Sequence, residues 1–264
     1  MWTGASDVDR RRRRPCENRG VSTFETEAVV LRAIRYAEAD SVLTLLTLER
    51  GRTSAIAKGA RRATSRLGGR LQPGVRARVT LHEGRGDLMN VRGAVVLDPY
   101  AGLWTEGYRL RAASSVLESA LRTTADREPS PGVYHLVVRA LALLAAAPPR
   151  PAPPRLDPVV MGARAKLLVV GGLLPRLTEC AACGGPPPLG AFSAVQGGAL
   201  CAACAGLGEP VDLRALAALA ALVGRPLSEV PEACSPALVQ EVERMIGLVL
   251  RDHLGVMLRS ATPL

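Results

Sequence analysis

Four cysteines in two closely spaced pairs are the residues of this chain best suited to chemistry. Cys180 and Cys183 form the first pair, Cys201 and Cys204 form the second, and 17 residues separate the two pairs. This repeated C-x-x-C spacing is typical of a tetrahedral zinc site. Four thiolates complete the coordination shell and leave no position for water or substrate. The pattern therefore predicts one structural zinc ion rather than a catalytic one.

Two structural disulfides are the alternative interpretation of the same four cysteines. We favour the metal because no apolar signal segment follows the N-terminal arginines, so export is not expected. Thiols stay reduced in the cytosol, where they bind metal instead of pairing. Cys16 and Cys234 lie far from both pairs, and we interpret them as non-ligands.

The charge of the chain is strongly positive and unevenly distributed. The net charge is +10, and the window from Glu49 to Arg85 holds ten basic residues but only two acidic ones. Such a balance predicts an anionic partner and favours nucleic acid. An ordinary solvated surface is the alternative. We expect DNA phosphates to be contacted by six side chains of this window: Arg52, Lys58, Arg61, Arg62, Arg66 and Arg70.

The N-terminal residues 1–22 read as a disordered basic arm, because an unbroken arginine run from 10 to 14 repels itself. A nonspecific clamp on nucleic acid is the functional alternative for this arm. No apolar stretch reaches the roughly 18 residues needed to cross a bilayer. We therefore expect a cytoplasmic, nucleoid-associated protein with no membrane contact.

Residues 23–99 carry the pattern of a small β-barrel. Runs rich in Val, Leu, Ile and Thr occupy 26–36, 41–48, 53–58, 75–83 and 88–96. Turn residues separate these runs, and a long arginine-rich loop covers 59–74. Five short strands with one long connection predict an OB-fold that binds DNA.

Residues 100–264 change to helical spacing. Helices are expected over 106–122, 131–147, 157–174, 212–223 and 236–258, with Asp212 and Ser235 as N-caps of the last two. The cysteines place a zinc module at 178–206, inside this helical domain. The predicted fold class is therefore α+β, with a barrel followed by helices. Tyr100, Trp104 and Tyr108 recur every four residues, which favours core packing over a base-stacking platform.

The sequence contains little that indicates catalysis. Its three histidines lie outside any recognisable nucleophile motif, and neither a phosphate-binding glycine loop nor a dinucleotide fingerprint occurs. Phe24 and Tyr36 are the only aromatic residues of the barrel segment, so the barrel has few aromatic rings on which bases could stack. We expect binding through the DNA backbone, neutral to sequence and tolerant of duplex.

Several motifs in a fixed order resemble those of one family, RecO. The barrel segment contributes Glu27-Ala28-Val29-Val30-Leu31-Arg32, Ala57-Lys58-Gly59-Ala60-Arg61-Arg62, Ser65-Arg66-Leu67 and Leu71-Gln72-Pro73. The helical segment contributes Gly171-Gly172-Leu173-Leu174-Pro175, Phe192-Ser193, Gly197-Gly198, His253-Leu254-Gly255 and Leu258-Arg259-Ser260. The resemblance covers roughly residues 24–260 and leaves out the N-terminal arm.

The resemblance implies a non-enzymatic role in recombinational DNA repair. RecO-like proteins bind single- and double-stranded DNA, anneal complementary strands and, with RecR, help RecA replace the single-strand binding protein SSB, whose C-terminal tail is an expected partner. It also implies zinc at the four cysteines. A zinc-containing transcription or RNA-processing factor with an OB-fold is the alternative, which sequence-specific binding would reveal. A zinc-dependent enzyme is a third class, which a fully thiolate-ligated metal would exclude.

Overall fold

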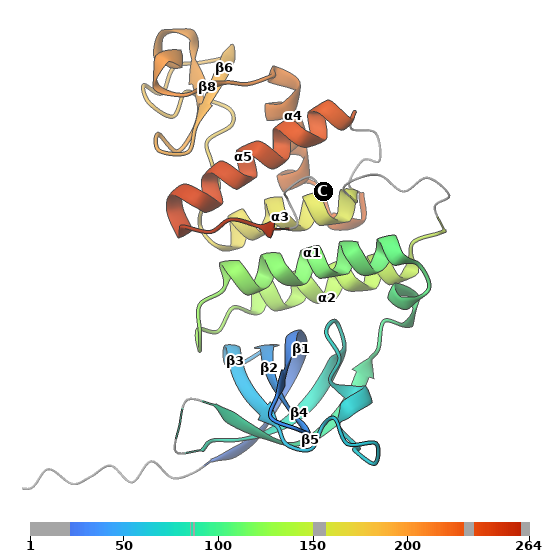
Figure 1. The fold of residues 1–264 in the computed structure, drawn as a ribbon. Coiled ribbons are helices and arrows are strands. Elements are labelled where there is room, and N and C mark those ends of the chain that lie inside the picture. The colour runs from blue at the N-terminus through green and yellow to red at the C-terminus, as the bar shows by residue number, and fades with distance from the viewer. Residues whose placement is uncertain (1–21, 85, 87, 150–156, 230–234, 260–264) are drawn as a thin grey trace, which may run out of the picture.

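The computed structural model of the chain describes residues 22–84, 86, 88–149, 157–229 and 235–259. The molecule is a stack of layers, with a β-barrel at one end, helices in the middle and a small sheet at the other end (Figure 1). The predicted basic arm, apart from Ser22, lies outside the described residues, as do Cys16 and Cys234. No helix of the described segments has the length and apolar character needed to cross a membrane.

Five strands close into the barrel. They are β1 (Thr23–Tyr36), β2 (Asp40–Thr47), β3 (Gly51–Ala57), β4 (Arg76–His82) and β5 (Met89–Asp98). Their order around the barrel is β1-β2-β3-β5-β4. The parallel contact between β3 and β5 completes the ring at Ala55–Met89 and Ile56–Asn90, and the other pairs are antiparallel. This confirms the predicted OB-fold.

The barrel packs one outer face against the first helical layer. This layer consists of a short 3-10 turn, η2 (Ala101–Trp104), and helices α1 (Gly107–Thr123) and α2 (Pro131–Ala146). Val29, Leu31 and Leu46 point out of the barrel and are buried in one core cluster with these helices. Gly51 has φ +64°, and a Cβ there would lie 1.9 Å from the Glu128 carbonyl oxygen, so only glycine permits this close contact with the α1–α2 loop.

Helix α3 (Pro158–Val170) connects the two helical layers. It contacts α1 and α2 on one side and α4 (Leu213–Gly224) and α5 (Pro236–Leu254) on the other. Both predicted N-caps are confirmed, because Asp212 accepts from the Arg214 amide and Ser235 accepts from the Leu238 amide. Helices α3 and α5 end before residues 174 and 258, where the prediction had placed their ends, because glycines follow each helix at 171–172 and 255.

The far end of the stack is the small sheet with the cysteines. It contains β6 (Leu189–Ser193), β7 (Gly198–Cys201), a 3-10 segment η3 (Ala202–Leu207) and β8 (Glu209–Pro210), in the order β7-β6-β8. One hydrophobic cluster joins this sheet to α3, α4 and α5. The sequence predicted a zinc module here, but not these short strands.

The three regularly spaced aromatic residues do not share one helix face. Tyr100 adopts a left-handed backbone conformation before η2, Trp104 ends η2, and Tyr108 lies in the first turn of α1. Tyr100 and Tyr108 are buried, as the packing prediction required, whereas Trp104 is 51% exposed. The prediction was therefore wrong for Trp104, because the break between η2 and α1 turns it outward.

Candidate metal centre and nucleic-acid interface

The structure brings all four predicted cysteine ligands together. Their Sγ atoms lie within 4.8 Å of one another, and the Sγ atoms of Cys183 and Cys201 are 3.7 Å apart. All four are free thiols, so the disulfide alternative is not what the structure shows. Metal–sulfur bonds of about 2.3 Å in a tetrahedron place sulfurs about 3.8 Å apart. The donor set therefore fits a tetrahedral metal ion.

Backbone hydrogen bonds, rather than side chains, hold the two cysteine pairs in place. The Cys180 amide donates to the Gly185 carbonyl at 2.8 Å, and the Ala181 amide donates to the Ala199 carbonyl at 2.8 Å, which ties the first pair to β7. Gly198 has φ +153°, and a Cβ there would lie 2.2 Å from the Arg176 carbonyl oxygen. The strand leading to the second pair can approach the first pair closely because this residue is glycine.

The electrostatics of the cluster favour a cation at its centre. Backbone N–H groups of Cys201 and Cys183 donate to the Cys180 sulfur and lower the pKa of that thiol to about 6. Hydrogen bonding with the Cys183 and Cys201 thiols raises the pKa of Cys204 to about 12. One thiolate therefore forms easily, while hydrogen bonds among the thiols and, to a smaller extent, the charge on Cys180 oppose further ionisation. A divalent cation removes this opposition.

The basic loop, residues 58–70 between β3 and β4, carries five of the six predicted DNA ligands. All five side chains are exposed: Lys58, Arg61, Arg62, Arg66 and Arg70. Over the described segments, none of the five forms an ion pair with a carboxylate. The guanidinium groups of Arg61 and Arg70 each donate to one backbone carbonyl, of Ala37 and Ala94. Their remaining donors face solvent and suit phosphate oxygens.

Buried residues anchor the basic loop on the barrel. Ala60 and Leu71 are buried in the barrel core, and Leu67 packs against it. The Gly59 amide donates to the Asp40 carboxylate at 2.7 Å, and the Arg61 amide donates to the Ala39 carbonyl at 2.8 Å. These contacts fix the loop against the β1–β2 turn, so its cationic side chains project from a supported backbone.

Arg52, the sixth predicted ligand, lies apart from the basic loop. Its Nε donates to Asp126 at 2.7 Å, its Nη1 donates to the Leu121 carbonyl, and its side chain is only 21% exposed. Both acceptors belong to the end of α1 and the loop that follows it. The structure therefore does not bring Arg52 together with the other five residues.

Sequence reasoning missed the exposed end of β1. Strand β4 pairs only with Thr23–Val29, and a bulge follows Val30, so residues 32–36 of β1 pair with β2 alone. Arg32 and Arg35 are exposed there, and the basic loop contacts the turn that follows this strand. The available signal was two arginines inside an otherwise apolar strand.

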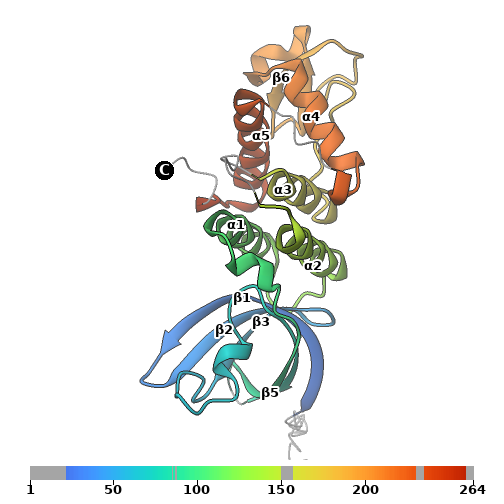
Figure 2. The same ribbon diagram turned by 90° about the vertical axis from the view of Figure 1, so that its right-hand side faces the viewer.

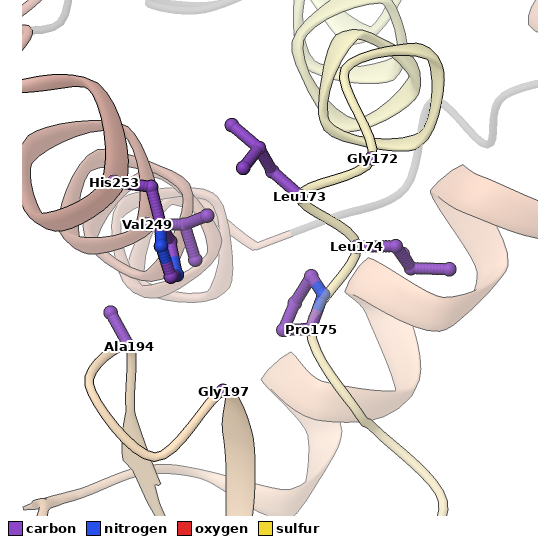
Figure 3. A pocket seen from close by; sticks show the side chains of 8 residues that line it. All are labelled: Gly172, Leu173, Leu174, Pro175, Ala194, Gly197, Val249 and His253. Carbon is purple, nitrogen blue, oxygen red and sulfur yellow. The ribbon is translucent and has the colours of Figure 1, made fainter.

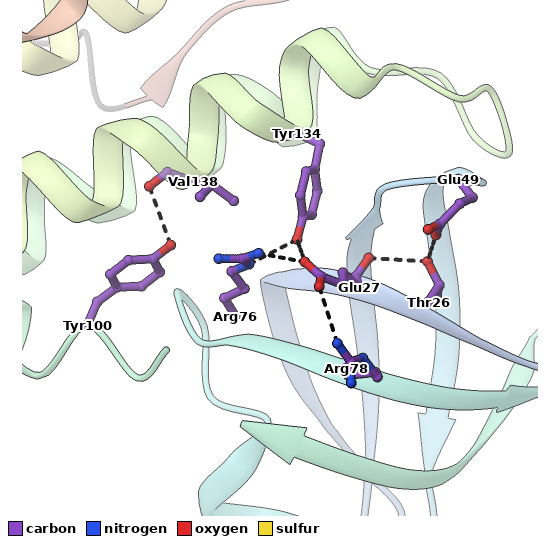
Figure 4. A network of polar contacts seen from close by, with 8 residues as sticks. All are labelled: Thr26, Glu27, Glu49, Arg76, Arg78, Tyr100, Tyr134 and Val138. Carbon is purple, nitrogen blue, oxygen red and sulfur yellow. Dashed lines mark hydrogen bonds and ion pairs between the residues drawn. The ribbon is translucent and has the colours of Figure 1, made fainter. Parts of the chain in front are cut away.

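A polar network joins the barrel to α2 (Figure 4). Glu27 on β1 accepts from Arg76 Nη2 at 2.6 Å and from the Tyr134 hydroxyl at 3.2 Å, and it lies 3.6 Å from Arg78. The hydrogen bond from Arg76 holds the pKa of Glu27 below its ordinary value. Burial raises the pKa of Tyr134. The network positions the barrel relative to the helices and leaves no free carboxylate at this junction for chemistry.

One pocket of about 240 Å³ lies where the segment after α3 meets α5 and the β6–β7 turn (Figure 3). Its lining residues are Gly172, Leu173, Leu174, Pro175, Ala194, Gly197, Val249 and His253. Of these eight, His253 alone has an ionisable side chain. The lining therefore offers no acid–base pair or activated nucleophile.

Comparison with known proteins finds the same family in both the N-terminal and the C-terminal parts of the chain. Residues 21–100 match the family model for the Recombination protein O N terminal region, and residues 105–262 match the model for the C terminal region. A protein of Anaeromyxobacter sp. strain K named DNA repair protein RecO is 38% identical over 234 residues, which cover 86% of this chain and 90% of that protein. The protein of the same name from Streptomyces avermitilis is 35% identical over 250 residues, which cover 91% of this chain and 98% of that protein.

The family matches and the structure agree on the arrangement of the chain. The first match spans the OB-fold barrel, and the second spans the helices and the four clustered cysteines. Identity at this level extends over nearly the whole length of the relatives rather than over one motif. This chain belongs to the RecO family.

Proposed function

We propose that this protein is a DNA-binding recombination mediator without enzymatic activity. It binds single- and double-stranded DNA, anneals complementary strands and, with RecR, helps load RecA onto SSB-coated single strands in recombinational repair. Family membership and the names of the relatives support this assignment. The observation that carries it is the basic loop, whose five exposed cations have no carboxylate partner over the described segments.

The basic loop acts by neutralising phosphates. Each contact releases condensed counterions, so affinity falls steeply as salt concentration rises. A cationic loop that contacts the DNA backbone lets two strands approach one another while their mutual repulsion is screened. Lys58, Arg61, Arg62, Arg66 and Arg70 make these contacts. Arg52 acts indirectly, because its bonds to Asp126 and Leu121 hold the α1–α2 loop against the barrel.

The four cysteines hold one structural zinc ion in this proposal. When bound, zinc supplies four bonds that fix the two cysteine pairs relative to each other. The surrounding packing carries this rigidity further, because the buried Cys180 belongs to the same hydrophobic cluster as α3, α4 and α5. The zinc module at 178–206 therefore braces the helical domain, 100–264, while DNA is bound by the barrel domain, 23–99.

The remaining partners follow from the same role. A mediator that acts on coated single strands meets SSB, through its C-terminal tail, and RecR. The protein works in the cytoplasm on the nucleoid. The arrangement needs no nucleotide hydrolysis, since binding alone brings strands together.

Strand annealing on SSB-coated DNA tests the proposal. The double variant Arg61→Glu/Arg62→Glu should lose at least about tenfold in DNA affinity, show a shallower salt dependence by about one to two contacts, and anneal poorly. Arg225→Glu/Arg251→Glu makes the same charge change on exposed residues of the helical domain and serves as the matched control.

Full annealing by Arg61→Glu/Arg62→Glu would remove the basic loop from the mechanism. A strong preference among oligonucleotides of equal length but different sequence would instead favour a transcription or RNA-processing factor, because backbone contacts do not read sequence.

A further inference from the structure

The outer face of β1, β2 and β3 carries an apolar row that the helices leave uncovered. Cross-strand register places Ile34 opposite Val42, and Val42 opposite Ile56. Paired residues in antiparallel strands point to the same face of the sheet. Ile34 is 44% exposed, while Val42 and Ile56 are half-buried. Three apolar side chains thus lie side by side across three strands, at the surface.

Polar and aromatic side chains border this apolar row. Residues two apart on a strand share a face and lie about 6.6 Å apart, so Tyr36 follows Ile34 on one side and Arg32 precedes it on the other. Tyr36 is 54% exposed and Arg32 is exposed as well. The end of β1 and the start of β2 extend outward past the helical layer (Figure 2).

The basic loop borders the same face. The Arg61 guanidinium donates to the carbonyl of Ala37, the residue next to Tyr36, at 3.5 Å. Asp40 lies opposite Tyr36, and its carboxylate accepts from the Gly59 amide at 2.7 Å. The acidic group opposite the tyrosine therefore serves to anchor the loop backbone, and the Arg61 guanidinium lies at the residue next to the tyrosine.

Phe24, the other aromatic residue of the barrel, is already covered. The Arg50 guanidinium lies over its ring, 3.8 Å from the centroid, and Arg50 also pairs with Glu83 at 2.7 Å. Tyr36 is therefore the aromatic ring of the barrel that is available to a ligand. The sequence indicated a shortage of aromatic side chains but not that the remaining ring lies open beside the cations.

The charge of the surroundings decides what covers this face. On the stretch from Arg32 to Asp40, the acidic residues are Glu38 and Asp40. The cations that share the face of Tyr36 or lie in the adjoining start of the basic loop are Arg32, Lys58, Arg61 and Arg62. A ligand that combines negative charge with flat apolar surface matches this composition. Single-stranded nucleic acid has both, whereas a duplex exposes its phosphates and hides the faces of its bases.

We propose that Tyr36, Ile34 and Ile56 form a base platform, which contacts unpaired bases while the basic loop holds the phosphates of the same strand. This inference rests on the proposed function and extends it, because it makes the barrel prefer single strands over duplex. One aromatic ring gives a weak hold on the bases. A complementary strand can therefore displace the platform, and the resulting duplex stays bound only by its backbone.

Abasic DNA provides a matched ligand for the test. Wild-type protein should bind oligo(dT) at least about fivefold more tightly than an abasic oligonucleotide of equal length, the lower limit for one stacked base. Tyr36→Ala should bind the two alike and keep wild-type affinity for a hairpin duplex. Tyr36→Phe should restore the preference, because it keeps the ring. Val95→Ala, at a 62% exposed apolar residue of β5, should behave as wild type.

The outcomes separate the platform from the basic loop. If Tyr36→Ala still prefers oligo(dT) to abasic DNA, the platform is wrong while the role of the loop stands. If Tyr36→Ala binds all DNA normally but loses RecR-dependent RecA loading, the face docks a protein and the platform is again wrong. If Arg61→Glu/Arg62→Glu binds and anneals like wild type, the proposed function itself fails.

Discussion

Two arginines of the helical domain, Arg109 and Arg164, and the arginines of the basic loop have the same chemistry but opposite surroundings. Arg164 has a fully buried side chain that pairs with Glu243 and donates to Ser119, and Arg109 pairs with Glu106. The basic loop, by contrast, holds five exposed cations without carboxylate partners over the described segments. Charge that is used internally stabilises the fold, whereas charge that stays open is available to a polyanion.

The comparison has a direct energetic consequence. A buried guanidinium that loses its carboxylate is left charged in a poorly solvated site, which costs several kcal/mol. An exposed guanidinium keeps its hydration and changes stability by less than about 0.5 kcal/mol when it is removed. The two ends of the molecule should therefore respond to mutation in separate ways, one through stability and the other through binding.

Metal removal should produce the largest effect, and it should be confined to one end. Bound zinc contributes about 10–16 kcal/mol to the folding of isolated zinc fingers, so stripping it or introducing Cys180→Ser should unfold the module around the cysteines. The barrel has its own hydrophobic cluster and should survive. Metal analysis, and circular dichroism before and after chelation, would measure this. Oligonucleotide affinity in low salt should stay within about threefold.

If DNA affinity fell in parallel with loss of metal, DNA binding by the barrel would depend on the zinc module, which would contradict this prediction. A metal content of zero in freshly purified protein, with the module still folded, would contradict the zinc assignment itself. Cys183→Ser is the informative second variant, since Cys183 is the exposed member of the set and leaves the buried Cys180 in place.

Breaking the buried ion pair should produce the next largest effect. Glu243→Ala leaves Arg164 buried without this carboxylate and should lower the free energy of unfolding of the helical domain by about 3–5 kcal/mol. Urea denaturation followed by circular dichroism measures it. Arg66→Ala in the basic loop is the control, with an expected change under about 0.5 kcal/mol and a clear loss of DNA affinity. If both variants changed stability equally, the contrast between the buried ion pair and the exposed loop cations would be wrong.

The repeating patterns of the sequence predicted most of the architecture. Alternating residues located the five strands, helical spacing and caps located the five helices, and the cysteine spacing located the cluster. Each of these signals is local, because it depends on neighbouring residues along one element. The strands β6 to β8 escaped prediction since they are too short for a period to show, and backbone contacts around Gly198 hold them together.

Long-range pairing explains what the sequence could not show. The charge window correctly located a cationic loop, but the removal of Arg52 from that loop depends on Asp126, 74 residues away. Likewise, the open face at Tyr36 depends on how far β4 follows β1, which is a property of strand register. The pairing of Arg164 with Glu243 spans 79 residues and leaves no periodic signal.

The junction between barrel and helices should give the smallest effect, and a pH-dependent one. Arg76 and Tyr134 donate to Glu27, so the pKa of this carboxyl lies below its ordinary value of 4.5. The network then contributes stability above about pH 4.5 and loses it as pH falls through the lowered pKa. Because Glu27 is 25% exposed, Glu27→Gln should cost only about 1 kcal/mol at pH 7. Urea titrations should show wild type and variant converging as pH falls through the lowered pKa of Glu27. A difference independent of pH would mean that packing, rather than charge, joins the two layers.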